Sequence, residues 1–395
     1  MTLAFPLAGL RVLDLSRVLS GPFAGRMLAD LGADVVKVEP PDGDSTRLWG
    51  EVRAGLSGFY TQQNAGKRNV CVSLSAPAGA QVVQDLAAHA DIVIENFRPG
   101  VAQRLGIGWD ELSARNPRLV MLSISGYGQD EPGPPRAAFA PIIHATSGLV
   151  ERQARDDGVR PTDPMLSIAD LLAGLHGLVA VLAALRLRER TGTGQFIDMS
   201  MLDAMLATDD YAHHYVDASP VGRLGGLLWQ TQSGYVMTAG DLRHTWKQIS
   251  PAHGLNDGLP REAGLEDKVS ARHRILIDWF LSHPDAATLH AALKAADLIG
   301  SDVMSPQEVW TGPDVARRNM VAEIDGRDGA PRMVVQSPYR FSAAASGVQG
   351  RAPFRGEHNE QVLAEWACLA DREIATLTNA GVLLAEPGAQ VEVVK

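Results

Sequence analysis

The sequence predicts an α/β protein with a large, Rossmann-like parallel-sheet domain and a smaller α+β domain. Over the first 200 or so residues, short apolar runs rich in β-branched residues alternate with segments of helical spacing, a pattern typical of a mainly parallel sheet. From about residue 208 turn-forming residues dominate, and beyond them the regular alternation of strand and helix patterns is lost. Helical patterns resume near the C-terminus.

The chain opens with a β-α-β unit. Residues 11–16 (RVLDLS) form a short apolar strand, residues 22–32 have helical spacing with Pro22 in the first turn, and residues 33–40 read as a strand again. The later elements of this block are further helices and buried strands, over residues 77–90, 91–96, 114–128, 171–190 and 194–206.

The expected domains are a first part of the large domain over residues 1–207, a linker over 208–235, a small domain over 236–330, and a C-terminal return to the large domain over 331–395. Helical patterns fit the last two segments, at residues 272–283, 286–297, 353–367 and 372–383.

Composition excludes several classes of protein. Lys and Arg total 36 against 46 Asp and Glu, and a net charge of −10 disfavours nucleic acid or an anionic membrane as the main partner. The N-terminus lacks a charged region ahead of an apolar core, and no run approaches ~18 consecutive apolar residues, so we expect a cytoplasmic protein. Cys71 and Cys368 have no Cys or His at metal-ligand spacing, so we expect buried free thiols and no metal site.

The first β-α-β unit does not have the glycine pattern of a nicotinamide enzyme. Its turn, SRVLSGPFAG, lacks G-x-G-x-x-G and places Arg17, Val18 and Leu19 where a pyrophosphate would need glycine. A nicotinamide oxidoreductase is therefore disfavoured.

Two basic loops lie next to strands. The first, ENFRPGVAQRLG (95–106), follows a buried strand and carries Arg98 and Arg104; the second, NAGKRNV (64–70), carries Lys67 and Arg68. Together they are candidates for the phosphates of an adenine nucleotide. The alternatives are a solvated helix start with Asn96 as its N-cap, and a solvated turn.

Asp170 is the most conspicuous acid of the sequence. It lies inside the apolar run 164–190, and no basic residue stands three or four positions away to pair with it. Ser167-x-x-Asp170 is a capping-box pattern, which predicts a carboxylate in the first turn of a helix, where the ionised form is favoured. Asp170 is then either a structural cap or a reactive group.

Several blocks of the sequence resemble the class III coenzyme A transferases, the family that includes formyl-CoA transferase, the carnitine CoA-transferase and α-methylacyl-CoA racemase. The likeness covers most of the first 206 residues and is weaker at GEHNEQVL (356–363) and poor over 225–330. The blocks are residues 9–44, 64–70, 90–106, 116–129, 166–185 and 191–206.

The resemblance implies an acyl-CoA:carboxylate CoA-transferase of the EC 2.8.3 type, acting on an acyl-CoA and a small carboxylic acid. Asp170 matches the family's nucleophile, which would form an aspartyl anhydride and then an aspartyl-CoA thioester. The family also implies a homodimer of interlocked chains. By the same resemblance CoA would contact Val18, Leu19, Leu74, Ser75, Asn96, Phe97, Arg98, Arg104 and Phe139.

The sequence departs from the family pattern at several positions. Leu19 replaces a glutamine and Pro40 a CoA-binding arginine of formyl-CoA transferase, and only Gly225 and Gly226 match its mobile glycine loop. Phe139 stands where the racemases have a histidine, so a 2-methylacyl-CoA racemase is the runner-up; a CoA-binding protein without activity is disfavoured by the intact Asp170. His144 either approaches the acyl group or is a hydrogen-bonded core residue.

Overall fold

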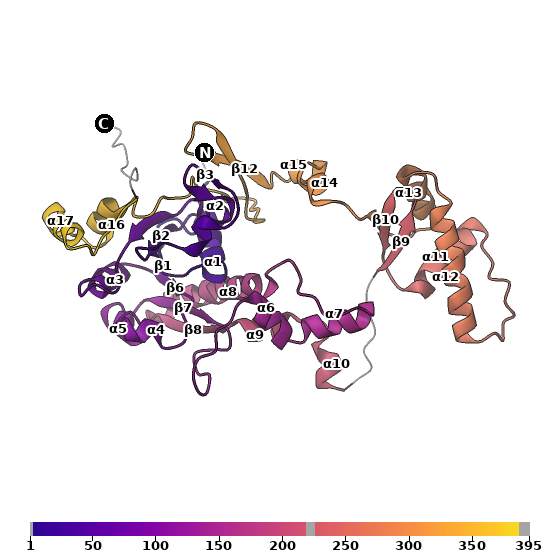
Figure 1. Cartoon of the computed structure of the whole chain (residues 1–395), viewed down its shortest axis with the longest axis horizontal. Coiled ribbons are helices and arrows are strands. Elements are labelled where there is room, and N and C mark those ends of the chain that lie inside the picture. The colour runs from indigo at the N-terminus through magenta and orange to yellow at the C-terminus, as the bar shows by residue number, and fades with distance from the viewer. Residues whose placement is uncertain (1–2, 219–225, 387–395) are drawn as a thin grey trace. The chain divides into compact units, whose positions relative to one another are not determined.

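The computed structural model describes residues 3–218 and 226–386 of the chain. The chain divides into two compact units: Met1–Ala212 with Arg318–Lys395 forms the large unit, and His213–Arg317 forms the small unit (Figure 1). The small unit therefore starts and ends earlier than the predicted 236–330. The predicted linker 208–235 holds a short helix and a strand, α10 (Ala212–Val216) and β9 (Leu227–Thr231).

A six-stranded parallel sheet forms the centre of the large unit, in the order β5-β2-β1-β6-β7-β8. The predicted parallel α/β fold is thus confirmed. The chain starts at β1, builds outward through β2 and β5, and then crosses back to add β6, β7 and β8 on the other side. The strands are β1 (Arg11–Asp14), β2 (Asp34–Glu39), β5 (Arg68–Cys71), β6 (Ile92–Glu95), β7 (Val120–Ser125) and β8 (Gln195–Ser200).

This order creates a topological switch point between β1 and β6. The loops that follow these two strands leave the sheet in opposite directions, which opens a crevice at the carboxyl ends of the strands. Ligands of open α/β sheets bind in such crevices.

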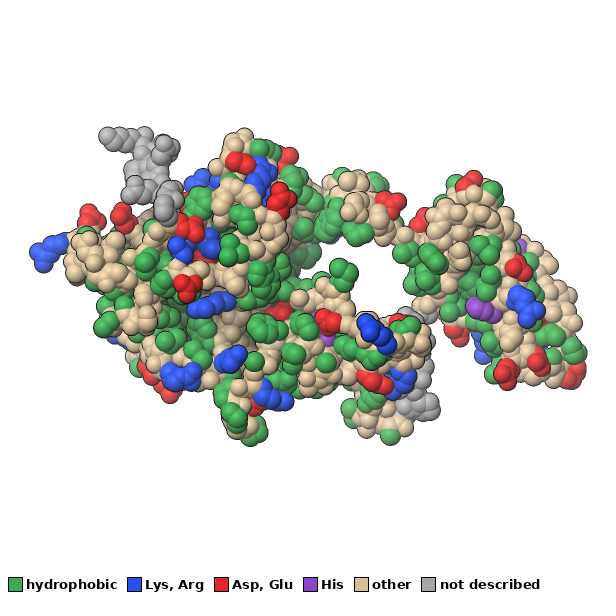
Figure 2. Space-filling view, viewed as in Figure 1, with side chains coloured by type: hydrophobic (Ala, Val, Ile, Leu, Met, Phe, Trp, Pro, Cys, Tyr) green, Lys and Arg blue, Asp and Glu red, His purple; other side chains and the backbone are tan. Residues whose placement is uncertain are grey.

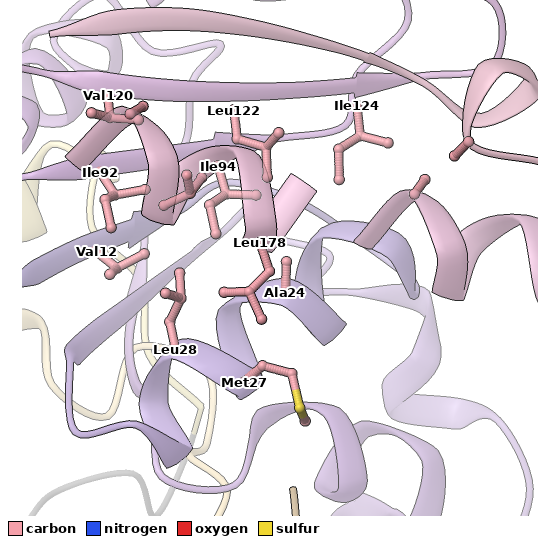
Figure 3. Packing of buried hydrophobic residues seen from close by; sticks show 14 of the residues in the cluster. Val12, Ala24, Met27, Leu28, Ile92, Ile94, Val120, Leu122, Ile124 and Leu178 are labelled. Carbon is pink, nitrogen blue, oxygen red and sulfur yellow. The ribbon is translucent and has the colours of Figure 1, made fainter. Parts of the chain in front are cut away.

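Both faces of the sheet are covered by helices, which is why its strands read as continuous apolar runs. Figure 3 shows one of the two cores, where Val12 and Ile94 of the sheet pack with Leu28 and Leu178. The helices of this face are α1 (Ser20–Asp30), α6 (Ala140–Thr146), α7 (Leu149–Asp157), α8 (Ile168–Thr191) and α9 (Met201–Thr208). The helices of the opposite face are α3 (Gly79–Ala87), α4 (Val101–Arg104), α5 (Trp109–Arg115), α16 (Asn359–Trp366) and α17 (Asp371–Asn379).

The C-terminal segment returns to the outer edge of the sheet. The amide of Ser73 donates to the carbonyl of Val382, and that of Leu384 to the carbonyl of Cys71. The large unit also contains two short hairpins, a 3₁₀ turn and a helix: β3 (Val52–Arg53) with β4 (Leu56–Ser57), β12 (Val321–Asp325) with β13 (Pro331–Val335), η1 (Ser45–Leu48) and α2 (Gly58–Asn64).

The small unit has an antiparallel sheet in the order β11-β10-β9 and a core of its own. Trp229 stacks on Phe280 with ring centroids 4.6 Å apart. Its other elements are β10 (Gly234–Thr238), β11 (Gly300–Asp302), α11 (Leu242–His253), α12 (Leu265–Leu281), α13 (Ala286–Ala295), α14 (Pro306–Trp310) and α15 (Pro313–Arg317). Of the glycine loop compared with formyl-CoA transferase, residues 222–225 lie outside the described residues.

The surface of the molecule carries charges of both signs. On the face in Figure 2, acidic and basic side chains are interspersed. Within the described residues one helix, α8, is long and apolar enough to cross a membrane; it packs against α1 and the sheet.

Cys71 is buried as expected, and burial raises the pKa of its thiol to about 12. The expectation for Cys368 is wrong, because this residue lies exposed in the turn after α16.

Candidate active site

A cavity of about 330 Å³ lies at the carboxyl ends of β1, β6 and β7, at the switch point of the sheet. Six residues predicted from the sequence line it: Val18, Asn96, Phe97, Arg98, Phe139 and Asp170. The other lining residues are Arg17, Ser20, Pro99, Ile124, Ser125, Gly126, Arg136, Ala137, Ala138 and Met201.

Four residues predicted to contact CoA do not line this cavity. Leu19 is buried beside Val18, and Leu74 packs against the core under α3 and α4. The Ser75 hydroxyl lies 3.1 Å from that of Ser73. Arg104 ends α4, and its guanidinium lies close to Gly100.

The carboxylate of Asp170 lies where three helices begin. The hydroxyl and the amide of Ser20 and the amide of Ala140 face it as potential hydrogen-bond donors, and each lowers its pKa. Ser20 is the first residue of α1, Ala140 is the first residue of α6, and Asp170 itself lies in the first turn of α8. The positive ends of three helix dipoles therefore converge on one carboxylate.

Burial nevertheless raises the pKa of Asp170 above its ordinary value. The loss of solvent is the largest influence, and the Ser20 and Ala140 donors and the nearby His144 only partly oppose it. The predicted capping box is wrong, because Ser167 is the N-cap of α8 but makes no side-chain capping hydrogen bond. The helix terminus was expected to decide the ionisation of Asp170, but desolvation outweighs it.

Two roles were predicted for His144, and the structure shows it as a hydrogen-bonded core residue. Its side chain is fully buried, with Nδ1 at 2.8 Å from Oδ1 of Asp163, while Nε2 accepts a hydrogen bond of 3.1 Å from the amide of Ala169. An accepting Nε2 means that the proton of the neutral ring is on Nδ1. His144 thus satisfies one of the free amides at the start of α8, a role left open by Ser167.

The turn between β1 and α1 is held by side chains from two neighbouring loops. The Asn96 side chain accepts from the Arg17 amide and donates to the Arg17 carbonyl, both at 2.8 Å, and its Nδ2 lies 3.2 Å from Oγ of Ser20. The Val18 amide donates to Asp44 at 3.1 Å. Asn96 was also considered as a helix N-cap, which is wrong, because α4 begins later and its N-cap is Gly100.

Asp44 is itself fixed by a buried ion pair. Lys37 Nζ lies 3.1 Å from its carboxylate, and Thr46 donates to it from both its amide and its hydroxyl. Burial opposes the charge, but Lys37 and Thr46 together lower the pKa of Asp44 to about 2. Asp44 therefore stays ionised as an acceptor for Val18.

The second basic loop does not supply phosphate ligands. Lys67 is buried, its ammonium lies 2.8 Å from the Asp14 carboxylate, and burial lowers its pKa to about 8. Arg68 is engaged by Asp34 and Glu365. The prediction for this pair is wrong because both cations already have carboxylate partners far away in the sequence.

The sequence did not single out four polar residues of the cavity: Arg17, Ser20, Ser125 and Arg136. Arg136 stacks on Tyr127, with its guanidinium 3.5 Å from the ring centroid, and pairs with Glu131. It lies in a Gly- and Pro-rich loop with no periodicity to place it, whereas Ser20 could have been found as the polar residue that opens α1. Within residues 3–218 and 226–386, no group of three His, Cys, Asp or Glu side chains is arranged to hold a metal.

Residues 7–359 match CoA-transferase family III. The chain is 38% identical to the succinyl-CoA:glutarate CoA-transferase of Mus musculus, with 96% of this chain and 90% of the relative covered. It is 33% identical to the beta subunit of the succinyl-CoA–L-malate CoA-transferase of Chloroflexus aurantiacus, with 97% and 99% covered. A CAIB/BAIF family protein from Brucella suis has the same fold, with a TM-score of 0.79, 29% identity, and 92% and 100% covered.

The chain belongs to CoA-transferase family III. It is an enzyme of the EC 2.8.3 type that transfers CoA from an acyl-CoA to a carboxylic acid.

Proposed function

We propose that Asp170 is the covalent nucleophile of the transfer. The observation that carries this proposal is the position of its carboxylate in a cavity at the switch point of the sheet, at the start of α8 and beside the first residues of α1 and α6. Burial raises the pKa of this carboxylate, and a more basic carboxylate is a better nucleophile once it is ionised.

In the first half of the reaction, a carboxylate oxygen of Asp170 attacks the thioester carbon of the acyl-CoA. The CoA thiolate leaves, and a mixed anhydride remains on Asp170. The thiolate then attacks the Asp170 carbonyl carbon, expels the donor acid as a carboxylate and forms an aspartyl-CoA thioester. No net proton is taken up or released.

In the second half, the acceptor carboxylate attacks the aspartyl-CoA thioester and expels the thiolate. The thiolate attacks the acceptor's carbonyl carbon in the new anhydride, which frees Asp170 and releases the acceptor as its CoA ester. The amides of Ser20 and Ala140, which already favour the ionised carboxylate, would donate to the oxyanions that form on the Asp170 carbonyl.

The cavity suits the thioester end of CoA. Val18, Phe97 and Phe139 offer apolar surface for the pantetheine, and Arg98, which also lines the cavity, would contact a phosphate. Leu19, Leu74, Ser75, Asn96 and Arg104 remain proposed CoA contacts from the resemblance; those outside the cavity would meet the nucleotide end.

We propose succinyl-CoA as the donor and a small dicarboxylic acid as the acceptor. Relatives are named for succinyl-CoA with glutarate or L-malate. Arg17 and Arg98 line the cavity with positive charge, which favours substrates with a second carboxylate, whereas Arg136 is paired with Glu131. A racemase is disfavoured because Phe139 cannot act as a base and both ring nitrogens of His144 are engaged.

We further propose a cytoplasmic homodimer that uses no metal and binds neither nucleic acid nor membrane. The acidic net charge supports the exclusion of nucleic acid. The interlocked arrangement of the chains is implied by the resemblance, and an exposed apolar side of α8 supports a partner there.

The test replaces Asp170 by Ala and by Asn. Both variants should fold, because the raised pKa of Asp170 means that its ionised form opposes folding at neutral pH, yet CoA transfer from succinyl-CoA to a panel of mono- and dicarboxylic acids should be lost. Wild-type protein treated with succinyl-CoA and then hydroxylamine should give a modified Asp170 in peptide mass mapping. A rate of transfer near that of the wild type in Asp170→Ala would refute the role of Asp170 as the nucleophile. A wild-type protein that binds CoA but transfers none would be a non-catalytic binding protein.

A further inference from the structure

We propose that Ser20 is a second catalytic residue and that Asn96 positions it: the Ser20 hydroxyl donates to an Asp170 carboxyl oxygen and stays on that oxygen through the covalent intermediates. This inference rests on the proposed role of Asp170 as the nucleophile. It adds a side-chain donor to the two backbone amides and assigns a role to Asn96 that is separate from CoA binding.

The hydrogen bonds around Ser20 give its hydroxyl a fixed direction. Nδ2 of Asn96 can only donate, and it lies 3.2 Å from Oγ of Ser20, so Oγ accepts on that side. The hydroxyl proton is then free to point to Asp170, which lines the same cavity and whose pKa the Ser20 side chain lowers. A donor that is itself a hydrogen-bond acceptor is polarised and becomes a stronger donor.

A purely structural role does not account for this hydroxyl. Serine at the start of a helix commonly caps it, but Ser20 is already inside α1, whose N-cap is Leu19. The Ser20 side chain is almost fully buried, and its two partners, Asn96 and Asp170, both line the cavity.

The backbone around Ser20 is held in place from two sides. Val18, a β-branched residue, has the left-handed φ of 67° and is kept there by the bond from its amide to Asp44. On the other side, α8 approaches so closely that a Cβ at Gly174 would lie 2.7 Å from the Ser20 carbonyl oxygen. Such a strained, closely packed turn fixes Ser20 relative to Asp170.

The hydroxyl matters when the Asp170 carbonyl is attacked. As the thiolate sulfur bonds to the anhydride carbon, the carbonyl π electrons move to oxygen, and the oxyanion collapses when the donor carboxylate leaves. The same carbon carries an oxyanion when the acceptor carboxylate displaces CoA. Ser20 keeps its proton in both steps and stabilises the charge by hydrogen bonding, because no proton has to be transferred.

The test compares Ser20→Ala and Ser20→Cys with Ser57→Ala as the matched control. Ser57 is also buried at the start of a helix, where it caps α2 and bonds the Thr46 carbonyl, but it does not line the cavity. We expect Ser20→Ala to lower kcat about 10²–10³-fold, the loss typical of one oxyanion donor, with KM for succinyl-CoA changed less than threefold. Ser20→Cys, a weak donor of similar size, should lie between Ser20→Ala and the wild type, and Ser57→Ala should keep wild-type kcat.

A pH profile separates catalysis from structure. Without the Ser20 donor the Asp170 carboxylate is less stabilised, so the acidic limb of kcat/KM should move to higher pH in Ser20→Ala and not in Ser57→Ala. A kcat within threefold of the wild type in Ser20→Ala would overturn the proposal. If Asp170→Ala is inactive in the same assay, the proposed function stands despite that result; if Asp170→Ala is active, the proposed function itself fails.

The role of Asn96 is tested by a double-mutant cycle. Asn96→Ala should reduce kcat in the wild-type background by removing the bond that directs the Ser20 hydroxyl. In the Ser20→Ala background the directed hydroxyl is already absent. The fold loss of kcat caused by Asn96→Ala should therefore be at least five times smaller there than in the wild-type background. An equal loss in both backgrounds would overturn the positioning role.

Discussion

Glu95 is a buried carboxyl group beside the site that the proposed reaction does not use. It ends β6, where it accepts a hydrogen bond of 2.7 Å from the Phe97 amide and another from the Ser123 hydroxyl. Burial raises its pKa to about 7, these hydrogen bonds only partly compensate, and the negative charge of Asp198 adds to the rise. Glu95 thus holds the backbone at Phe97 while changing charge near neutral pH.

This pKa predicts how stability changes with pH. Below pH 4.5, the ordinary pKa of Glu, the group is protonated in the folded and unfolded states alike. Between pH 4.5 and 7 only the unfolded state loses the proton, so stability falls as pH rises, by about 3 kcal/mol in all. Glu95→Gln should remove this fall. Urea unfolding between pH 4.5 and 8 measures the free energy of unfolding of the wild type and of Glu95→Gln, with Glu111→Gln, at an exposed position, as the control. If the free energies of wild type and Glu95→Gln change with pH in parallel, the prediction is wrong.

At the residue scale the sequence identified Asp170 and most of the loop after β6, because acids in apolar runs and polar residues after buried strands are visible locally. Partners distant in sequence were not visible. Lys67 looked free until the fold brought it to Asp14, and the raised pKa of Asp170 depends on burial beneath α1 and α6. The Ser20 hydroxyl has a function only once Asn96 and Asp170 are in place.

At the scale of elements, the contact between α1 and α8 determines the geometry of the site. Gly174 lies one turn after Asp170, and its missing side chain lets α8 approach the Ser20 carbonyl. Glycine in a helix is less stable than alanine by ~1 kcal/mol, so its presence here favours close approach over helix propensity.

Gly174→Ala should therefore lower both stability and activity. A Cβ 2.7 Å from a backbone oxygen forces the helices apart, at a typical cost of ~1–3 kcal/mol, which exceeds the gain in propensity. The shift would also lengthen the bonds from Ser20 to Asp170 and reduce kcat. Thermal unfolding and kcat are measured beside Gly58→Ala, where a Cβ would have its nearest contact at 3.9 Å and both quantities should stay near wild type. A more stable, fully active Gly174→Ala would show that the contact is loose.

Elements with long or continuous apolar runs were predicted well. The long apolar helix expected at 171–190 is α8, Ile168–Thr191, and the buried strands β1, β2, β6 and β7 lie where the apolar runs are. Segments without such a pattern were missed. The hairpin β12–β13 and helices α6 and α7 have short or mixed sequences whose apolar residues become visible as core only through tertiary contacts.

At the scale of the whole molecule, α8 has an exposed side that a single chain leaves without cover. Leu175, Val179 and Leu182 stand on one side of the helix at helical spacing and are 39%, 64% and 37% exposed. Contiguous apolar surface of this kind marks an interface with another protein or with a membrane. The opposite side of α8 is used inside the chain, where Ala169, Ala173 and Val181 are buried, so a second copy of this chain is the partner we propose.

Val179→Asp should weaken that dimer. A carboxylate on each copy would be moved from water into an apolar interface, which costs several kcal/mol, whereas Val269→Asp places the same charge on an exposed position of α12 in the small unit and serves as the matched control. In sedimentation equilibrium, wild type and Val269→Asp should have twice the 42.2 kDa mass of the chain, while Val179→Asp should shift toward the single-chain mass on dilution. A wild type that sediments as a monomer would refute the dimer. A Val179→Asp dimer as tight as the wild type would place the interface elsewhere, and binding of the wild type but not Val179→Asp to phosphatidylcholine vesicles would assign this side of α8 to a membrane.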